Sequence, residues 1–504
     1  MNNKTFATSV QGILARYLHS SSIASLSCIV GLALLATTTL ATATDQSLKP
    51  NPCHLSPEDA VGLSQDFTTN VHALRNYKGT IARLLKAEKF EDLDCLADRA
   101  RSNKERFPGG TWKIHEIYRA LYKPVQYPQH ATEEDYRLVL QRLKSWQTVH
   151  PNSITARIAL GWAYIDYAGY ARGDGYANTV SQNGWKLHDE RMAEAERVLE
   201  DALTLPTKCP EWYMAMENVA EARGWSETQK NALFGEADKF EPDYFYSARA
   251  RAYYLQPKWS GQPGDTERFV NDIADRIGGE QGDILYFEVA SSPDLICGCD
   301  DEPHFSWERI LRGYEASEKR YGVSLAGLNR MAYLAENYGD RDPVFADKAF
   351  GRIGDQWHEE TWHQKKEDFD AAKQWAAQTA PDVMKVRNEE AAAKTNTSTP
   401  EGARYQVAFE KSFRELLQDC VRSTGNDAGA QWQKGKFETM MYVGAKGTAD
   451  DGWINAMGPA VACAYRKIKS ARQEQLPIFP APPQANYWVR LDLDWADFTS
   501  VAAK

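Results

Sequence analysis

The chain has 504 residues, of which 43% are hydrophobic and 25% are charged, and its formal net charge at pH 7 is −10. This length exceeds what one hydrophobic core usually serves, so we expect two or three domains. The acidic balance argues against a nucleic-acid-binding protein and against a partner of anionic membranes, because both need basic patches that release counterions.

The N-terminal segment differs from the rest of the chain. It has no acidic residue before Asp45, and an apolar run occupies residues 23–40. Small residues at 41–43 then provide a site that a signal peptidase accepts. We predict a cleavable signal peptide over residues 1–43 and a periplasmic or secreted bacterial protein. The alternative is an N-terminal membrane anchor, since an apolar run of this length can just span a bilayer.

Export would place the cysteines in an oxidising compartment, where most of them should pair. The chain has 8 cysteines, one of which falls within the predicted signal peptide, so the mature chain keeps an odd number. We predict the disulfides Cys420–Cys463 and Cys53–Cys95, because the two members of each pair fall within one compact stretch of chain.

The remaining cysteines leave their pairing open. Cys297 and Cys299 can pair outward, for instance with Cys209, form a small strained ring, or bind a soft metal. No histidine stands in register with them, so we expect no metal site here.

Through most of the chain, apolar residues recur three and four positions apart, which is the spacing of amphipathic helices. Pro210 and Pro242 each precede a second helical stretch and lie 32 positions apart, close to the tetratricopeptide period of about 34 residues. We therefore predict a mainly α fold. A TPR-like helical repeat, or solenoid, covers residues 130–378 and follows an N-terminal helical region over residues 44–129.

The segment GYARGDGYANTVSQNGW, residues 169–185, concentrates glycine among these helical stretches. It lengthens one of the intervals between the prolines that precede helical stretches, so we predict a loop inserted into one repeat. Such insertions often lie on the binding face of a repeat protein. Its candidate ligand-binding residues are Arg172, Asp174, Tyr176 and Trp185. The alternative is a tight turn in which Arg172 and Asp174 pair locally and the aromatic side chains pack.

The segment LQPKWSGQPGD, residues 255–265, is a second break in the helical pattern. Trp259 and Asp265 are its candidate ligand-binding residues, and Asp265 can also cap a helix that begins near Thr266. The alternative is a rigid loop pinned by a buried Trp259. If this loop shares a face with the 169–185 segment, the aromatic residues of both line a groove for a peptide or a glycan.

Together these segments resemble bacterial proteins that carry the DUF4034 domain of unknown function. The resemblance covers roughly residues 130–375, and its most specific parts are Y-A-R-G-x-G-x-A and L-x-P-x-W-x-G-x-x-G-D. It implies a helical, repeat-like fold in a bacterial envelope or secreted protein. It brings no activity, so it assigns no catalytic residue.

Residues 379–404 are small and polar, without an apolar face, and we predict a linker that is helical at its start. Residues 405–504 form an α+β domain in the order helix, hairpin, helix and strand, with the hairpin turning at Asp451 and Gly452. This order resembles the C-terminal module of TonB-like energy transducers. The resemblance implies a small periplasmic interaction domain.

Motifs of common enzymes are missing from the sequence. It has no G-x-S-x-G elbow, P-loop or dinucleotide fingerprint. In HEETWH, at 358–363, the histidines are five positions apart, whereas a metalloprotease needs H-E-x-x-H with both on one helix face. We expect no catalytic residue, metal or cofactor. The predicted function is an exported, non-catalytic helical-repeat protein that binds another protein or an envelope polymer; the alternative is a glycan- or peptidoglycan-active enzyme with an aromatic cleft.

Overall fold

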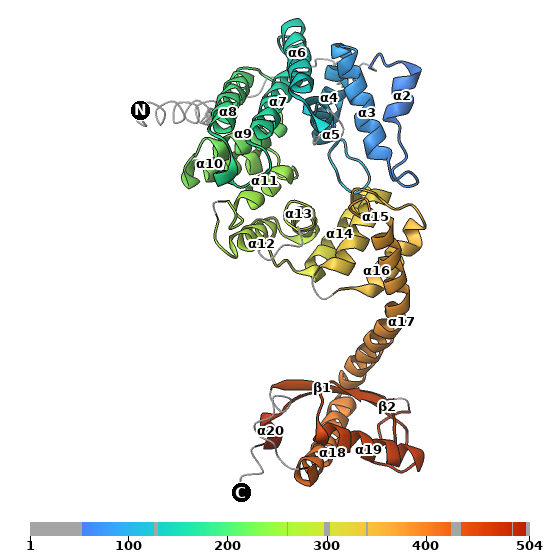
Figure 1. The fold of residues 1–504 in the computed structure, drawn as a ribbon. Helices are drawn as coiled ribbons and strands as arrows, with labels where there is room; N and C mark the ends of the chain where they lie inside the picture. Colours follow the sequence, from blue (N-terminus) through green and yellow to red (C-terminus); the bar gives the residue numbers. More distant parts are fainter. Residues whose placement is uncertain are drawn as a thin grey trace, which may run out of the picture. The chain divides into compact units, whose positions relative to one another are not determined.

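The computed structural model describes residues 53–124, 130–259, 261–296, 303–338, 341–424, 435–485 and 487–499. These residues are mainly helical, with one small antiparallel sheet near the C-terminus (Figure 1). The predicted signal peptide over 1–43 and the pair Cys297 and Cys299 lie outside the described residues. Within these ranges, no helix combines the length and the apolar character needed to cross a membrane.

The first helices in the described part of the chain are four that pack on one another: α2 (Pro57–Leu63), α3 (Ala73–Lys86), α4 (Phe90–Ser102) and α5 (Lys113–Tyr122). The predicted disulfide Cys53–Cys95 is present, with an S–S distance of 2.06 Å. It joins the segment ahead of α2 to α4. The short helix α2 is therefore held both by packing and by a covalent bond.

Consecutive helices continue to contact one another from α6 to α13. Their N-termini carry capping residues that satisfy exposed backbone amides; Thr132 and Ser226, for example, each form a capping box. The helices are α6 (Glu133–Val149), α7 (Ile154–Arg172), α8 (Gln182–Ala202), α9 (Glu211–Ala222), α10 (Glu227–Phe240), α11 (Tyr246–Tyr254), α12 (Asp265–Ile277) and α13 (Gly279–Ala290).

The predicted loop over 169–185 is shorter in the structure. Helix α7 continues through Gly169 to Arg172, and α8 begins at Gln182, so the connection covers only 173–181. A glycine inside a helix costs about 1 kcal/mol relative to alanine. At Gly161 of the same helix, close packing on α8 requires the glycine, because an added Cβ would lie 2.8 Å from the Leu199 side chain; nothing lies within 4 Å of a Cβ added at Gly169.

The last helices of the body contact its first segments. These helices are α14 (Trp307–Tyr321), α15 (Leu325–Asn337) and α16 (Pro343–Ile353). The backbone N–H of Leu325 donates to the carbonyl of Phe67 (2.9 Å), and that of Gly109 donates to Gly322 (3.0 Å). These contacts connect parts of the chain that are more than two hundred residues apart, and one hydrophobic core extends through the helical body.

The segment 379–404, predicted as a linker, is helical apart from Ser398 and Thr399. Helix α17 (Lys366–Thr397) spans 32 residues and carries Pro381 in its interior. Alanine, glutamate and lysine are strong helix formers, so this small, polar composition extends the helix rather than ending it. The amide of Asn396 also donates to the carbonyl of Trp488 (3.1 Å), so the end of α17 contacts the sheet.

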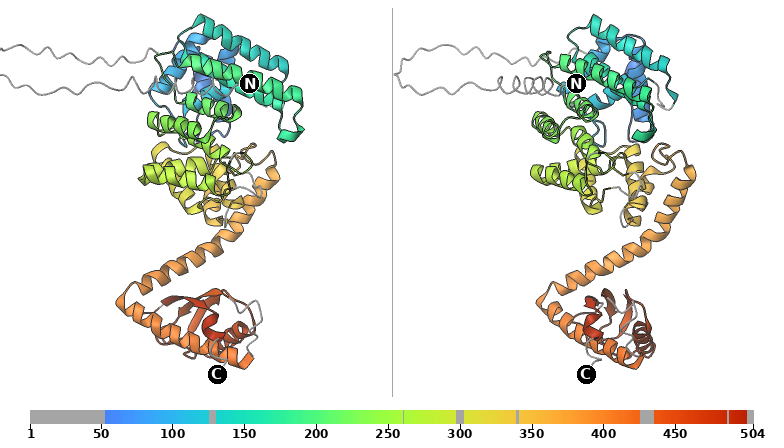
Figure 2. Two further views of the ribbon diagram at one scale, coloured as in Figure 1. Left: turned by 90° about the vertical axis from the view of Figure 1, so that its left-hand side faces the viewer. Right: turned by 60° about the vertical axis from the view of Figure 1, so that its left-hand side comes forward.

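The C-terminal domain has a three-stranded sheet in the order β2-β1-β3. Figure 2 shows this sheet in the angle between α17 and α18. Met440 and Met441 point to opposite faces of the central strand, as neighbours in a strand do, and both are buried, so both faces are covered. The elements are α18 (Pro400–Thr424), β1 (Lys436–Val443), β2 (Ala449–Ile454), α19 (Pro459–Gln473), β3 (Tyr487–Asp494) and α20 (Ala496–Thr499).

Two predictions for this domain have different outcomes. The disulfide Cys420–Cys463 is present, at 2.09 Å, and joins α18 to α19. The predicted hairpin turn at Asp451 and Gly452 is wrong, because both residues lie inside β2. The turn lies at 444–448, where Gly447 has φ of 85°; this left-handed conformation is the one that a tight turn requires and that glycine adopts without strain.

Candidate functional site

The connection between α7 and α8 is exposed. Gly173, with φ of 70°, ends α7, and Tyr176 beyond it is 85% exposed. The guanidinium of Arg172 donates to the carbonyl of Gly173 (3.0 Å) and lies 5.7 Å from the centre of the Trp185 ring. The alternative in which Arg172 pairs with Asp174 is therefore not observed among the described residues, and the arginine instead faces an aromatic ring.

The loop between α11 and α12 also presents an aromatic side chain. Trp259 is 41% exposed, so the alternative of a buried anchor is wrong. Its ring lies 5.4 Å from that of Tyr253 and 5.9 Å from that of Tyr254. The indole is therefore packed against two tyrosines and still partly accessible to solvent.

Asp265 does not cap α12 as we predicted. It is the first residue of the helix, and Gly264 before it is left-handed, with φ of 84°. This entry turns the Asp265 carboxylate back toward the loop, where it accepts a hydrogen bond from the backbone N–H of Gln262 (2.7 Å). The same carboxylate forms an ion pair with Arg268. Asp265 therefore stabilises its own loop.

Tyr253 is influenced by residues of both loops. Burial raises the pKa of the Tyr253 hydroxyl and Asp294 raises it further, whereas a hydrogen bond with Trp259 and the positive charge of Arg172 lower it. Arg172 and Trp259 thus both act on one tyrosine. We name Arg172, Trp185, Tyr253 and Trp259 the aromatic–arginine cluster.

The structure brings three of the six predicted ligand-binding residues into this cluster: Arg172, Trp185 and Trp259. Asp174 and Tyr176 are exposed on the adjoining connection, and Asp265 is occupied with Arg268. Sequence reasoning missed Tyr253. The sequence signal that could have found it is the pair Tyr253 and Tyr254, which ends α11 shortly before Pro257 and Trp259.

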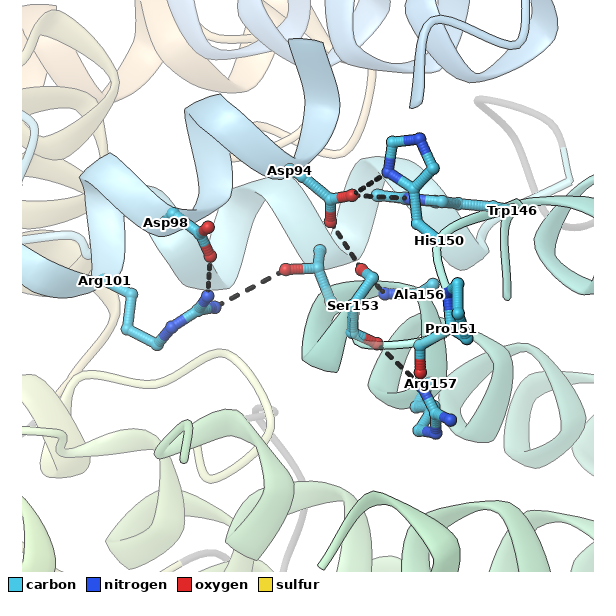
Figure 3. A network of polar contacts seen from close by, with 10 residues as sticks. Asp94, Asp98, Arg101, Trp146, His150, Pro151, Ser153, Ala156 and Arg157 are labelled. Atoms are coloured by element: carbon cyan, nitrogen blue, oxygen red, sulfur yellow. Dashed lines mark hydrogen bonds and ion pairs between the residues drawn. The ribbon is translucent and has the colours of Figure 1, made fainter. Parts of the chain in front are cut away.

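A serine, a histidine and an aspartate also meet at the start of α7 (Figure 3). The Asp94 carboxylate accepts a hydrogen bond from the Ser153 hydroxyl and lies 2.6 Å from Nδ1 of His150. In a catalytic triad the serine must contact the histidine, which takes its proton. Here both contact the carboxylate, and Ser153 also caps α7 by accepting from the N–H of Ala156 (3.0 Å). The arrangement fixes α7 to α4.

A second polar group is enclosed in the helical core. Nδ1 of His115 lies 2.9 Å from Oε2 of Glu211, and the Tyr244 hydroxyl donates to the same carboxyl group. Burial raises the pKa of Glu211 to about 8 and lowers the pKa of His115. Such shifts are common at active sites. Glu211 has no exposed surface, however, and so no access to a substrate in this conformation.

The two histidines of the HEETWH segment have separate partners. Nδ1 of His358 lies 2.9 Å from the Thr361 hydroxyl, and Nε2 of His363 lies 3.3 Å from the hydroxyl of Tyr333. Among the residues that the structure describes, no group of three or more histidine, cysteine, aspartate or glutamate side chains is placed to hold a metal ion. Cys209 is a buried thiol that accepts a hydrogen bond from the Tyr118 hydroxyl (3.6 Å).

No family model, no curated protein and no solved structure matches the chain. The resemblances to DUF4034 proteins and to the TonB-like module therefore stay predictions.

Proposed function

We propose that the chain is an exported helical-repeat protein that binds another protein or an envelope polymer and does not transform it. The observation that carries this proposal is the aromatic–arginine cluster, in which Arg172 faces the Trp185 ring and its positive charge lowers the pKa of Tyr253, the tyrosine that contacts Trp259. Tryptophan, tyrosine and arginine are the side chains that contribute most binding energy at protein interfaces. Their flat, partly polar surfaces suit a peptide and a sugar ring equally.

The exposure of the cluster supports a ligand of some size. Trp259 is 41% exposed and Tyr176, on the adjoining connection, is 85% exposed. A ligand that covers both side chains would bury apolar surface that is now in contact with water. The Arg172 guanidinium would orient such a ligand through its remaining N–H donors.

The location and the repeat character are parts of the same proposal. The two disulfides, Cys53–Cys95 and Cys420–Cys463, are consistent with an extracellular or periplasmic protein. The sequential contacts from α6 to α13 support TPR-like stacking of the kind that the DUF4034 resemblance implies. In such an array the inter-helix loops form a continuous binding face.

The test is retention of envelope components by the purified protein. We expect the wild type to retain a defined set of components, and the variant Tyr176→Ala/Trp185→Ala/Trp259→Ala to lose at least one of them. The matched control is Val61→Ala/Val149→Ala/Phe240→Ala, which removes exposed apolar side chains elsewhere on the helices and should retain the wild-type set. Circular dichroism must first show that both variants fold.

The enzyme alternative predicts a different result in the same assay. If the protein cleaves a glycan, incubation with envelope polymer releases reducing ends, and the release stops on substitution of a single carboxylate. Retention that is equal in the wild type and the triple variant contradicts the proposed role of the cluster.

A further inference from the structure

A groove lies between the edge strand β2 and helix α19 in the C-terminal domain. It offers about 390 Å³ of accessible space. Met441, Gly452 and Ile468 contribute apolar lining, and Tyr465, Arg466 and Lys469 contribute to the remainder. Gly452 has no side chain that could fill the space beside Met441. No acidic side chain lines the groove, so the charged part of its lining is cationic.

The charge of α19 is opposite to that of the chain as a whole. The helix contains four basic residues and no acidic one, whereas the chain carries a net charge of −10. Lys467 pairs with Asp419 on α18, and Arg472 donates through Nε to the carbonyl of Ala449 (2.6 Å). Arg466 and Lys469 are exposed and have no ion-pair partner within the described ranges. Two cations at the groove are therefore available to an anion.

Contacts from α19 already occupy both ends of the outer edge of β2. The backbone N–H of Ile454 donates to the Tyr465 hydroxyl (2.7 Å), and the carbonyl of Ala449 accepts from Arg472. An additional strand would need these same backbone groups. The groove therefore recognises an occupant mainly through the occupant's side chains. Its carboxylates would contact the two cations, and its apolar side chain would lie over Met441 and Ile468.

We propose that this groove binds an acidic segment of a partner protein, with carboxylates paired to Arg466 and Lys469 and an apolar side chain between β2 and α19. A charged membrane surface fits less well, because segments that bind anionic lipid typically present 4–8 basic residues, whereas two of the four on α19, Lys467 and Arg472, already have partners within the domain. The groove is a second site, and its occupation does not depend on the proposed role of the aromatic–arginine cluster.

The test measures the fluorescence anisotropy of a labelled peptide that alternates aspartate with leucine, added to the full-length protein. A second peptide, with asparagine in place of aspartate, isolates the charge. We expect the aspartate peptide to bind, and the asparagine peptide to bind about tenfold more weakly or worse. The substitutions Arg466→Glu/Lys469→Glu should weaken the binding of the aspartate peptide by a similar factor.

Two controls separate the groove from general charge and from the first site. Lys411→Glu/Lys446→Glu makes the same charge change at exposed positions elsewhere in the domain, and it should leave the affinity unchanged. The cluster variant Tyr176→Ala/Trp185→Ala/Trp259→Ala should do the same. Circular dichroism and an intact Cys420–Cys463 disulfide verify the folding of each variant.

Three results would overturn the proposal. One is the absence of binding of the aspartate peptide to the wild type. Another is equal binding to the wild type and to the groove variant. The third is binding of phosphatidylglycerol vesicles that depends on Arg466 and Lys469 when the peptide does not bind, because the groove would then serve a membrane surface.

Discussion

The helical body and the C-terminal domain have separate cores of different chemistry. The body core, within residues 67–376, encloses ionisable groups such as Glu211, Arg251 and Glu288. The core of the domain, within residues 405–498, is apolar and crossed by a disulfide. Among the described residues of 405–499, the buried polar residues are two threonines, Thr439 in β1 and Thr448 in the turn ahead of β2.

This difference predicts different sensitivities. A buried carboxyl group makes stability depend on pH, because its pKa differs between the folded and the unfolded chain. A small apolar core contributes only a modest free energy of unfolding, so the domain depends on its covalent cross-link. The body should therefore respond to pH and to changes in helix packing, and the domain should respond to reduction.

Removal of the domain disulfide should have the largest effect. Cys420→Ala/Cys463→Ala opens a loop of 43 residues, and we expect the free energy of unfolding of the domain to fall by about 4 kcal/mol. Chemical denaturation followed by circular dichroism should show the sheet unfolding earlier while the body transition is unchanged. Unchanged unfolding of the sheet would contradict the view that the domain depends on its cross-link.

Gly313→Ala should have the next largest effect, and it should act on the body. An added Cβ at this position in α14 would clash with the backbone carbonyl of Asp283 in α13. Backbone cannot move aside as a flexible side chain can, so we expect a loss of about 3 kcal/mol. Gly351→Ala in α16 is the matched control, since nothing lies within 4 Å of the added atom. It should leave the body unchanged or stabilise it by up to about 1 kcal/mol. Thermal unfolding of both variants measures the difference, and equal melting temperatures would contradict the predicted clash.

Glu211→Gln tests the pH dependence of the body. The folded protein keeps the Glu211 proton up to about pH 8, whereas the unfolded chain releases it near its ordinary value of 4.5. The stabilisation is thus complete below about pH 4.5 and is lost as the pH rises to about 8.

Removing this group should make the body transition less dependent on pH. His115 acts in the opposite sense, because its lowered pKa costs stability as the pH falls below 6.5. We expect the wild type to lose on the order of 2 kcal/mol more than the variant between pH 5 and pH 8. Urea unfolding at several pH values measures this, and identical pH profiles would show that Glu211 does not control the stability of the body.

Local patterns predicted most of the C-terminal domain. The amphipathic helix that carries Cys420 and the alternating strand before Trp495 each follow from a few neighbouring residues. The hairpin turn was misplaced because two glycine-containing segments, 444–448 and 451–452, are both compatible with a turn. The left-handed backbone of Gly447 shows that the turn lies in the first of them.

The body could be predicted less completely, because long-range contacts determine its arrangement. The helices follow from periodicity, but nothing local indicates that Leu325 contacts Phe67 or that Arg172 acts on Tyr253. Such contacts depend on how the helices pack. The predicted aromatic residues were therefore useful as candidates, while the contacts of Trp259 with Tyr253 and of Trp185 with Arg172 needed the structure.

Arg172→Ala should have the smallest effect on stability and a large effect on binding. The guanidinium is partly exposed at a helix end, so we expect a change of less than about 0.5 kcal/mol in the body transition. Retention of the ligand should fall with the loss of the cation that faces Trp185. A variant that is strongly destabilised would show that Arg172 acts in packing rather than in recognition.

The most direct measurement is photo-crosslinking in cells that make the protein. A benzophenone side chain replaces Tyr176, Trp259 or, as a control on a different exposed surface, Val149. If the two loops form one binding surface, Tyr176 and Trp259 yield adducts with the same partner, and Val149 yields none. Different partners at the two loop positions, or the same adduct from all three, would contradict a shared site at the aromatic–arginine cluster.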